Sequence, residues 1–459
     1  MSNLKGMVPP TIVAASRSYG RWHVAFGPRF FLLLLMGVFW LTLAFFDLRW
    51  AYAMLAWDAA VALVWIGDLL SLPRPAQLKV QRAWHGPPAL SVTSEVELML
   101  INESPRTLHA AVLDAVPGQL RTEPPQIDFS VAGRSDASKR YSIRPRQRGA
   151  ANLGDVYVRY QSVLRIAERW VRAPLEQRVQ IYPNLDEARK HSIFLLRSRQ
   201  IEMEKRHTRI RGIGREFESL REYREGDEYR DICWTAAARR GKLVTRLYQV
   251  ERSQTVWIVI DSGRLMRARI RDLTKLDYAV NAALSLAQVA LYSGDRVGLL
   301  AYGRKLQQRV PAARGSAHLR QMMEQLATIH EETSEADHLR TAGLLLTDQK
   351  RRSLVVWLTD LAETAMTPEV VEAASQMMTR HLVLFVAIGQ PDLNELAAQR
   401  PTDKAQMYRI AAAQEMIYRR ELMLARLRER GALAMEVSSA SLAPALVNSY
   451  LEVKARNQL

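Results

Sequence analysis

Two aspartates each stand at the end of a short apolar run with the length and composition of a buried β-strand. Asp261 closes the run TVWIVID, and Asp360 follows the run SLVVWLT. From residue 254 onward such runs alternate with helical patterns, which predicts a parallel sheet covered by helices on both faces. Because the carboxyl ends of parallel strands share one edge of the sheet, we expect the two carboxylates to lie close together. Carboxylate oxygens are suitable ligands for a hard cation such as Mg²⁺.

A second candidate is the charged stretch at residues 220–241, LREYREGDEYRDICWTAAARRG. Its alternating start predicts a strand, Asp227 can cap a helix that begins at about residue 228, and Gly241 can end that helix. Arginine binds carboxylates through two parallel hydrogen bonds, which fix one geometry. Two interpretations stay open, a structural latch or a partner-docking face. The motif consists of Arg221, Tyr223, Gly226, Asp227, Arg230, Asp231 and Trp234.

We expect this motif to form an intramolecular ion-pair network, with Trp234 buried beside it. The four charged members of the expected network are Arg221, Asp227, Arg230 and Asp231.

Other catalytic motifs are missing from the sequence. It contains no G-x-x-x-x-G-K-[ST], no H-E-x-x-H and no G-x-S-x-G. Cys233 is the only cysteine, which excludes an internal disulfide and a cysteine zinc site. It lies between Ile232 and Trp234 in an expected helix, where a small buried side chain is a simpler interpretation than a nucleophile. We therefore expect no enzymatic activity.

Two apolar runs near the N-terminus predict membrane helices. Residues 30–46 carry no charge, and residues 50–70 carry only Asp58 and Asp68. These lengths suit a transmembrane hairpin at residues 29–72. Basic residues flank both sides, so we expect residues 1–28 and the bulk of the chain in the cytosol, with the hairpin in the inner membrane as a multi-pass anchor.

The remaining pattern divides the chain further. Residues 76–184 alternate apolar and polar side chains between Pro- and Gly-containing turns, which predicts an all-β sandwich. Residues 185–215 form a basic connector, either solvated or in contact with anionic lipid. Residues 216–459 hold the charged motif and the α/β domain.

The chain is strongly basic, with 64 Lys and Arg against 47 Asp and Glu and a formal charge of +17. Acidic partners are therefore expected. The excess is spread along the chain rather than concentrated in one arm, so nucleic acid is not the expected partner.

The order of elements after residue 254 resembles the Rossmann-like von Willebrand factor A domain. That domain binds a divalent metal through D-x-S-x-S, a threonine and a second aspartate. Here Gly263 and Leu265 stand where the serines belong, and Ala336 stands in the threonine region. Asp261 and Asp360 alone match. Two carboxylates without hydroxyl partners make a poor magnesium cage, so we expect a degenerate site and no cofactor.

The stretch GREFESLREYREGDEYRDICWTAAARRGKLVTRLYQVE resembles the signature of the bacterial family called domain of unknown function 58. RQRGANLGDVYVRY and IYPN also resemble its sandwich segment. The resemblance implies two membrane helices, a sandwich-like region and an A-type domain, often associated with MoxR-type AAA+ ATPases. The expected function is a membrane-anchored, cytosol-facing scaffold or adaptor that presents the A-type domain to such an ATPase in envelope or complex assembly. The alternative is an enzyme with a site between the sandwich and the A-type domain.

Overall fold

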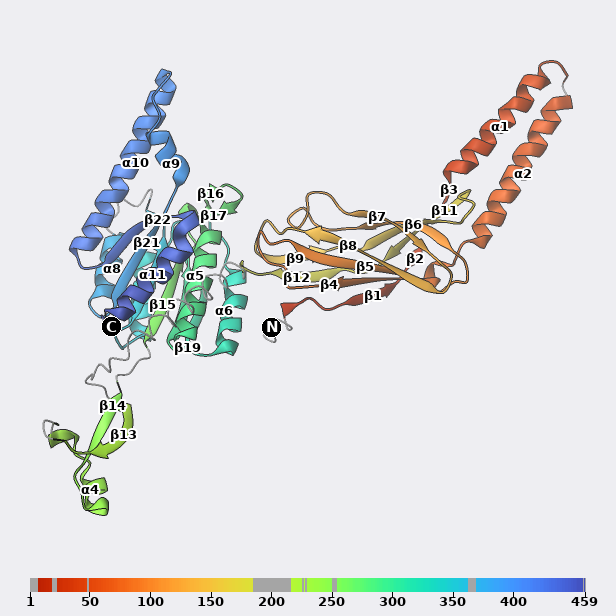
Figure 1. The fold of residues 1–459 in the computed structure, drawn as a ribbon. Helices are drawn as coiled ribbons and strands as arrows, with labels where there is room; N and C mark the ends of the chain where they lie inside the picture. The colour runs from red at the N-terminus through yellow and green to blue at the C-terminus, as the bar shows by residue number, and fades with distance from the viewer. Residues whose placement is uncertain are drawn as a thin grey trace. The chain divides into compact units, whose positions relative to one another are not determined.

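The computed structural model divides the chain into two compact units, Met1–Tyr182 and Pro183–Leu459 (Figure 1). The structure describes residues 7–18, 23–47, 49–184, 216–224, 227, 229–249, 254–361, 369–456 and 458. The basic connector expected at residues 185–215 lies outside the described residues.

The first unit contains an antiparallel β-sandwich whose strands bury alternate side chains. In the stretch SEVELML, for example, Val96, Leu98 and Leu100 all face the core, as the alternation predicts. One sheet has the order β1 (Ile12–Ala15), β4 (Leu78–Trp84), β5 (Ser94–Asn102), β8 (Ser135–Ile143). The other has the order β2 (Arg17–Ser18), β11 (Ala167–Ala173), β10 (Val156–Gln161), β6 (Leu108–Asp114), β7 (Gln126–Val131), and β9 (Gly149–Leu153) pairs with β12 (Gln177–Ile181).

Strands that precede the helix pair also belong to this sandwich. β1 pairs with β4, and β2 and β3 (Val24–Phe26) pair with β11. The boundary expected between an N-terminal segment at residues 1–28 and the sandwich is therefore wrong, because residues 12–26 contribute strands to the sandwich. These strands are only two to four residues long, too short to produce a periodic pattern, and their partners are distant in the sequence.

The two apolar runs form α1 (Pro28–Ala44) and α2 (Arg49–Ser71), which pack against each other as a helical hairpin (Figure 1). Gly37 permits a close approach, since a Cβ at this position would lie 2.8 Å from the indole of Trp57. Among the described residues, α2 is the one helix long and apolar enough to cross a membrane, and α1 is a shorter apolar helix. The structure therefore supports the hairpin but not two full-length spans.

Asp68 connects α2 to the sandwich. Its buried carboxylate accepts hydrogen bonds from the Ser162 hydroxyl and from the backbone N–H groups of Ile166 and Ala167, at 3.1 Å and 2.8 Å for the two amides. These residues form the turn between β10 and β11 and the start of β11. Asp68 therefore serves as a structural joint, which explains this carboxylate near the end of a mostly apolar helix.

The second unit contains a doubly wound α/β domain. Its sheet has the order β19 (Leu306–Ala313), β18 (Arg296–Tyr302), β15 (Thr255–Asp261), β20 (Leu354–Thr359), β21 (Leu382–Gly389), β22 (Leu433–Ser438), and only β19 runs antiparallel to its neighbour. This order reverses at β15, as in Rossmann-like sheets.

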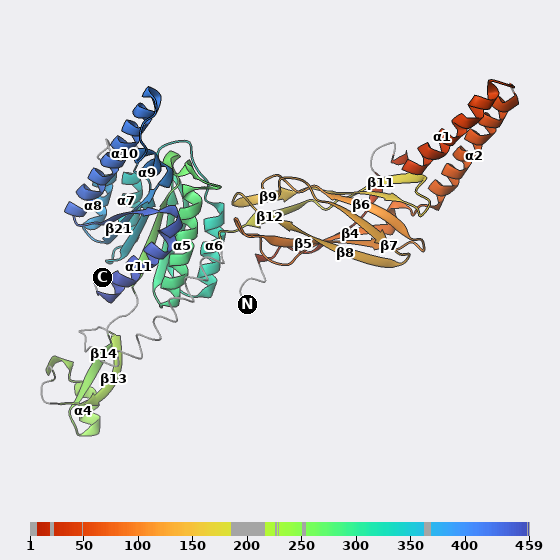
Figure 2. The same ribbon diagram turned by 45° about the horizontal axis from the view of Figure 1, so that its top comes forward.

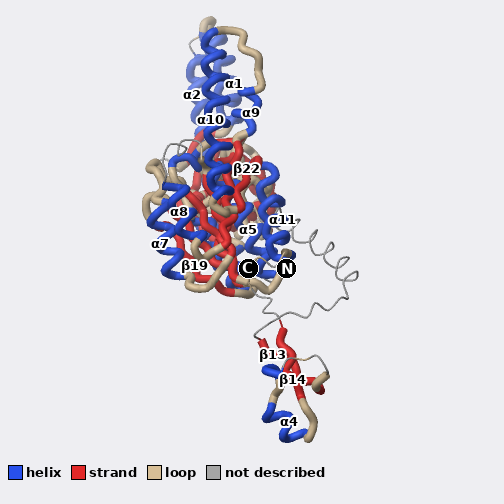
Figure 3. Tube along the Cα trace, turned by 90° about the vertical axis from the view of Figure 1, so that its left-hand side faces the viewer, coloured by secondary structure: helices blue, strands red, loops and turns tan. Residues whose placement is uncertain are grey.

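Helices cover both faces of this sheet, as the continuous apolar strands predict. Figure 3 shows α7 and α8 on one side of the strands and α5 and α11 on the other. The helices of the domain are α5 (Lys275–Tyr292), α6 (Ser316–Thr328), α7 (His338–Asp348), α8 (Glu369–Met378), α9 (Pro391–Ala397), α10 (Lys404–Glu429) and α11 (Leu442–Ala455).

The charged motif forms a small module of its own, built on a hairpin of β13 (Glu216–Glu222) and β14 (Val244–Gln249). Between the strands lie a 3₁₀ turn at Tyr229–Asp231 and the helix α4 (Trp234–Arg240). Gly241 ends α4 with a φ of 64°, as expected for a left-handed glycine cap. The helix begins later than predicted, because Cys233 rather than Asp227 occupies its N-cap position.

Candidate functional site

Asp261 and Asp360 lie side by side at the carboxyl edge of the sheet. Asp261 ends β15, and Asp360 follows β20, its parallel neighbour. Both side chains are buried, with 3% and 2% of their surface exposed. The sequence therefore predicts their position correctly, and their function depends on the groups around them.

Two cations bind the carboxylate of Asp360. The Lys275 Nζ donates to Oδ2 at 2.6 Å, and the Arg420 Nη2 donates to Oδ1 at 3.0 Å. Lys275 is fully buried and Arg420 is 2% exposed. Arg420 also contacts Glu436 at 2.6 Å through Nη1. Ion pairing offsets the large cost of burying these charges.

Asp261 is held by neutral donors. Its Oδ2 accepts from the Thr359 hydroxyl at 2.6 Å, and its Oδ1 accepts from the backbone N–H of Gly263 at 2.7 Å. Burial raises the pKa of Asp261 above its ordinary value, whereas the nearby His338 and the two hydrogen bonds act in the opposite direction. Both carboxylates are thus engaged within the protein.

This arrangement does not fit a magnesium site. Mg²⁺ needs free oxygen ligands in octahedral geometry, but both oxygens of Asp360 already bind cationic side chains. Within the described residues, no group of three or more His, Cys, Asp or Glu side chains is placed to hold a metal. We therefore assign no magnesium-dependent step to these residues.

Lys275 and Arg420 were not identified from the sequence. Lys275 begins α5 directly after Thr274, whose side chain caps the helix. Arg420 lies on the buried stripe of α10 with Ala413, Met423 and Leu427. An arginine on an otherwise apolar stripe was the available signal, but its partner is 60 residues away in the sequence.

A second buried cluster stabilises the same edge. The indole of Trp357 donates to the Tyr302 hydroxyl at 2.7 Å, and this hydroxyl lies 2.9 Å from the His338 Nδ1. Since an indole N–H can only donate, the tyrosine O–H is free to donate to the imidazole. No nucleophile takes part in these contacts, so we interpret the cluster as one that stabilises the fold.

In the charged module, Arg221 and Asp227 form the expected ion pair. The Arg221 Nη2 lies 2.6 Å from the Asp227 Oδ1. The other oxygen of Asp227 accepts from the Arg224 backbone N–H at 3.0 Å and from the Thr245 hydroxyl at 3.4 Å. The backbone hydrogen bond from Arg224, followed by the contacts with Arg221, lowers the pKa of Asp227. Asp227 thus joins the turn to both strands. Tyr223 stacks on Tyr229 beside it.

The rest of the predicted network is only partly described. Gly226 and the side chain of Arg230 lie outside the described residues, and Asp231 is half-buried in the 3₁₀ turn. The expectation that Trp234 is buried is wrong, because 66% of its surface is exposed. Ile232 and Cys233, which precede the helix, are buried instead.

Cys233 is buried, as expected, but its environment is polar. Its Sγ lies 3.5 Å from the Thr235 hydroxyl. Hydrogen bonds from Thr235 and Arg246 lower the pKa of the thiol to about 7.

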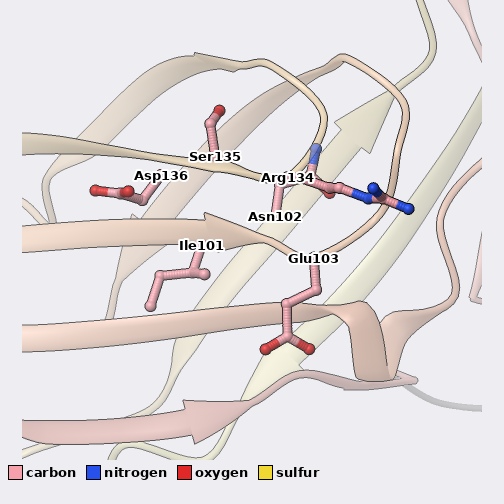
Figure 4. Close-up of a pocket in the computed structure, with 6 residues that line it drawn as sticks. All are labelled: Ile101, Asn102, Glu103, Arg134, Ser135 and Asp136. Atoms are coloured by element: carbon pink, nitrogen blue, oxygen red, sulfur yellow. The ribbon is translucent and has the colours of Figure 1, made fainter.

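A shallow hollow of about 330 Å³ lies on the sandwich, where β5 ends and β8 begins (Figure 4). Its side chains point in different directions, and the Asn102 amide is already bound to the backbone oxygens of Arg106 and Ala132. This hollow does not form a convergent binding site. It is lined by Ile101, Asn102, Glu103, Arg134, Ser135 and Asp136.

The fold therefore defines a chain with a sandwich that carries an apolar helix pair, a small charged module and a doubly wound α/β domain. A family model described as "Protein of unknown function DUF58" matches residues 219–413, which include most of the charged module and of the α/β domain.

Known relatives cover part of the chain. An uncharacterized protein of Mycobacterium tuberculosis is 28% identical over 153 residues, which are 33% of this chain and 48% of the relative. The chain thus matches about half the length of this relative.

Two solved structures are similar to 44% of this chain. The hypothetical protein BatB of Bacteroides thetaiotaomicron is covered completely, with 14% identity and a TM-score of 0.29. The vWF domain of the pilus tip protein Mfa5 of Porphyromonas gingivalis is covered over 95% of its length, with 11% identity and a TM-score of 0.27.

Proposed function

We propose that this chain is a membrane-anchored adaptor that presents its α/β domain to a protein partner on the cytosolic side. The membrane anchor is proposed because α1 and α2 expose a large apolar surface. Leu35, Phe39 and Leu63 are 70%, 62% and 69% exposed, and most of their apolar neighbours are exposed as well. An apolar surface of this extent is characteristic of membrane or protein contact. The hairpin would lie in the inner membrane.

Basic residues on both sides of the hairpin support a cytosolic orientation. Arg29 is the second residue of α1, and Arg74 follows the end of α2. Positively charged flanks stay in the cytosol. A cysteine added at the C-terminus, in a chain carrying Cys233→Ser, tests this directly. Protection from an impermeant reagent added outside intact inner membranes is expected, and labelling would contradict the orientation.

The partner we propose is a MoxR-type AAA+ ATPase. Support comes from the DUF58 family match and the resemblance of the charged motif to that family's signature. Affinity purification of the full chain from native membranes should recover such an ATPase. An enzyme with a site between the sandwich and the α/β domain is the alternative. Reproducible substrate turnover by the purified chain without a partner would favour it.

A further inference from the structure

Four arginines are exposed along one short segment at the carboxyl edge of the α/β sheet. The segment, here called the arginine hairpin, covers residues 264–274 and consists of a 3₁₀ turn (Arg264–Arg267) and the strands β16 (Arg269–Ile270) and β17 (Leu273–Thr274). It directly follows the end of β15. Its exposed arginines are Arg264, Arg267, Arg269 and Arg271.

The arginine hairpin is fixed to the domain. The side chains of Met266 and Ile270 are buried, at 0% and 3% exposure. The backbone N–H of Lys275 donates to the Ala268 oxygen at 2.9 Å, and the Tyr278 hydroxyl donates to the Ile270 oxygen at 3.3 Å. The arginines are thus presented by an ordered backbone, which lowers the entropic cost of binding a ligand.

The adjacent loop adds two cations. Arg304 and Lys305 are exposed in the turn that follows β18. The two segments start side by side: the N–H of Ser262, two residues before the hairpin, donates to the oxygen of Tyr302, the residue that ends β18 and precedes the turn, at 2.7 Å. Together the hairpin and this turn expose six cations.

Few exposed carboxylates balance this charge. In residues 262–274, 303–305 and 331–337, the exposed carboxylates are Asp272 and Glu335. Glu335 lies 3.3 Å from the Arg264 Nη2, so one arginine of the hairpin already binds a carboxylate. Half-buried Glu332 accepts from the Arg304 N–H and the Gln307 amide. Half-buried Glu331 accepts from the Thr274 hydroxyl at 3.0 Å, and half-buried Asp337 accepts from the Arg340 N–H at 2.9 Å. Among the exposed side chains of these residues, six cations face two carboxylates, so the exposed surface is net positive.

We propose that the arginine hairpin, with Arg304 and Lys305, binds an acidic polypeptide segment of the partner. This inference rests on the proposed adaptor function and names the chemistry that the partner supplies. The planar guanidinium group of arginine can bind a carboxylate through two parallel hydrogen bonds, whereas the ammonium group of lysine acts as a point charge.

The shape of the domain favours a polypeptide over a flat bilayer. β21 ends at the same edge, and α9 and the first half of α10 project beyond it (Figures 1 and 2). A planar surface would meet this projection before it reached the hairpin, whereas an extended segment can lie beside it. Met407 and Tyr408 on α10 are 48% and 71% exposed, which offers apolar contacts to a protein.

The test uses the full chain in nanodiscs of neutral lipid and a fluorescent glutamate-rich peptide at about 0.15 M salt, where distant charges are screened. Arg267→Glu/Arg269→Glu should weaken peptide binding at least about tenfold. The matched control is Arg351→Glu/Arg352→Glu, which makes the same charge change on exposed residues just before β20, at the opposite edge of the sheet. It should stay within about twofold of the wild type. Unchanged melting temperatures would show that both variants are folded.

Several outcomes would overturn the inference. The inference fails if the wild type does not bind the peptide. It also fails if the two double variants lose peptide affinity equally, because binding would then depend on the net charge of the chain and not on the hairpin. Arginine-dependent binding of phosphatidylserine vesicles or of an oligonucleotide, without peptide binding, would also overturn it.

Capture from native membranes separates this inference from the proposed function. If the wild type and Arg267→Glu/Arg269→Glu capture the same ATPase equally, the inference fails and the adaptor function stands. If the wild type captures no partner while peptide binding depends on the hairpin, the adaptor function fails and the acidic-polypeptide surface stands.

Discussion

The ammonium group of Lys275 lies 2.6 Å from the carboxylate of Asp360, and both side chains are almost completely excluded from solvent. Lys275 comes from the first turn of α5 and Asp360 from the end of β20, so this contact ties a helix to the centre of the sheet. With Arg420 on the other oxygen, the carboxylate is compensated by internal cations.

Lys275→Met should destabilise the α/β domain by about 3–5 kcal/mol, because removal of one partner from a buried ion pair leaves the other charge less compensated. Hydrogen exchange of the β15 and β20 amides measures this locally. Arg419→Met is the control. Arg419 forms an exposed pair with Glu415 on α10, so its loss should cost at most about 1 kcal/mol. Equal effects of the two substitutions would contradict the assigned role of Lys275.

Magnesium ions should bind the full chain weakly or not at all, since both oxygens of Asp360 already contact cationic side chains. Titration calorimetry should show no saturable heat, and EDTA should leave the melting temperature unchanged. Micromolar affinity that disappears in Asp261→Ala would refute this expectation and require an unconventional ligand set.

Asp68→Ala should loosen the joint between α2 and the sandwich. The substitution leaves the Ser162 hydroxyl and two backbone N–H groups without their acceptor, and each unpaired buried group costs about 1–3 kcal/mol. Exchange of the Ile166 and Ala167 amides should accelerate at least about tenfold. Asp47→Ala, in the exposed turn after α1, serves as the control. Unaltered exchange in Asp68→Ala would show that the joint is not needed.

His381 should make the α/β domain less stable in mild acid. Burial lowers the pKa of His381 to about 4, below its ordinary value of about 6.5. The unfolded chain therefore takes up a proton between these values while the folded chain does not, so stability is complete above about pH 6.5 and falls toward pH 4. Thermal unfolding across this range should show a shallower decline in His381→Gln. If stability falls equally with pH in the wild type and in His381→Gln, His381 is not the group responsible for the decline.

Trp234 separates the latch and docking interpretations of the charged module. Because the side chain is 66% exposed, Trp234→Ala should change stability by less than about 0.5 kcal/mol. If the module is a docking face, this variant should nevertheless lose partner capture. Arg221→Ala removes the ion pair with Asp227 and should increase exchange at the Arg224 amide. Normal capture by Trp234→Ala would leave the latch as the better interpretation.

The sequence predicts most of the strands of the α/β sheet because they are continuous apolar runs that end at recognisable residues, such as Asp261 and Asp360. The partners of Asp360 could not be predicted in this way. Lys275 and Arg420 are 85 and 60 residues away, and only the folded topology brings their helices to the carboxyl edge.

Short elements and exposed aromatic residues were harder to predict. The strand β2 has two residues, and its pairing with β11 spans most of the first unit. Trp234 was expected to be buried beside the ion-pair network, but 66% of its surface is exposed. The small interior of the module is filled by Ile232, Cys233 and Val244 instead.

The most direct test of the adaptor hypothesis is binding between the purified full chain in nanodiscs and a MoxR-type AAA+ ATPase from the same organism. Biolayer interferometry should show saturable binding that Arg267→Glu/Arg269→Glu weakens and Arg351→Glu/Arg352→Glu leaves unchanged. The absence of saturable binding, with nucleotide present or absent, would contradict the proposed partnership.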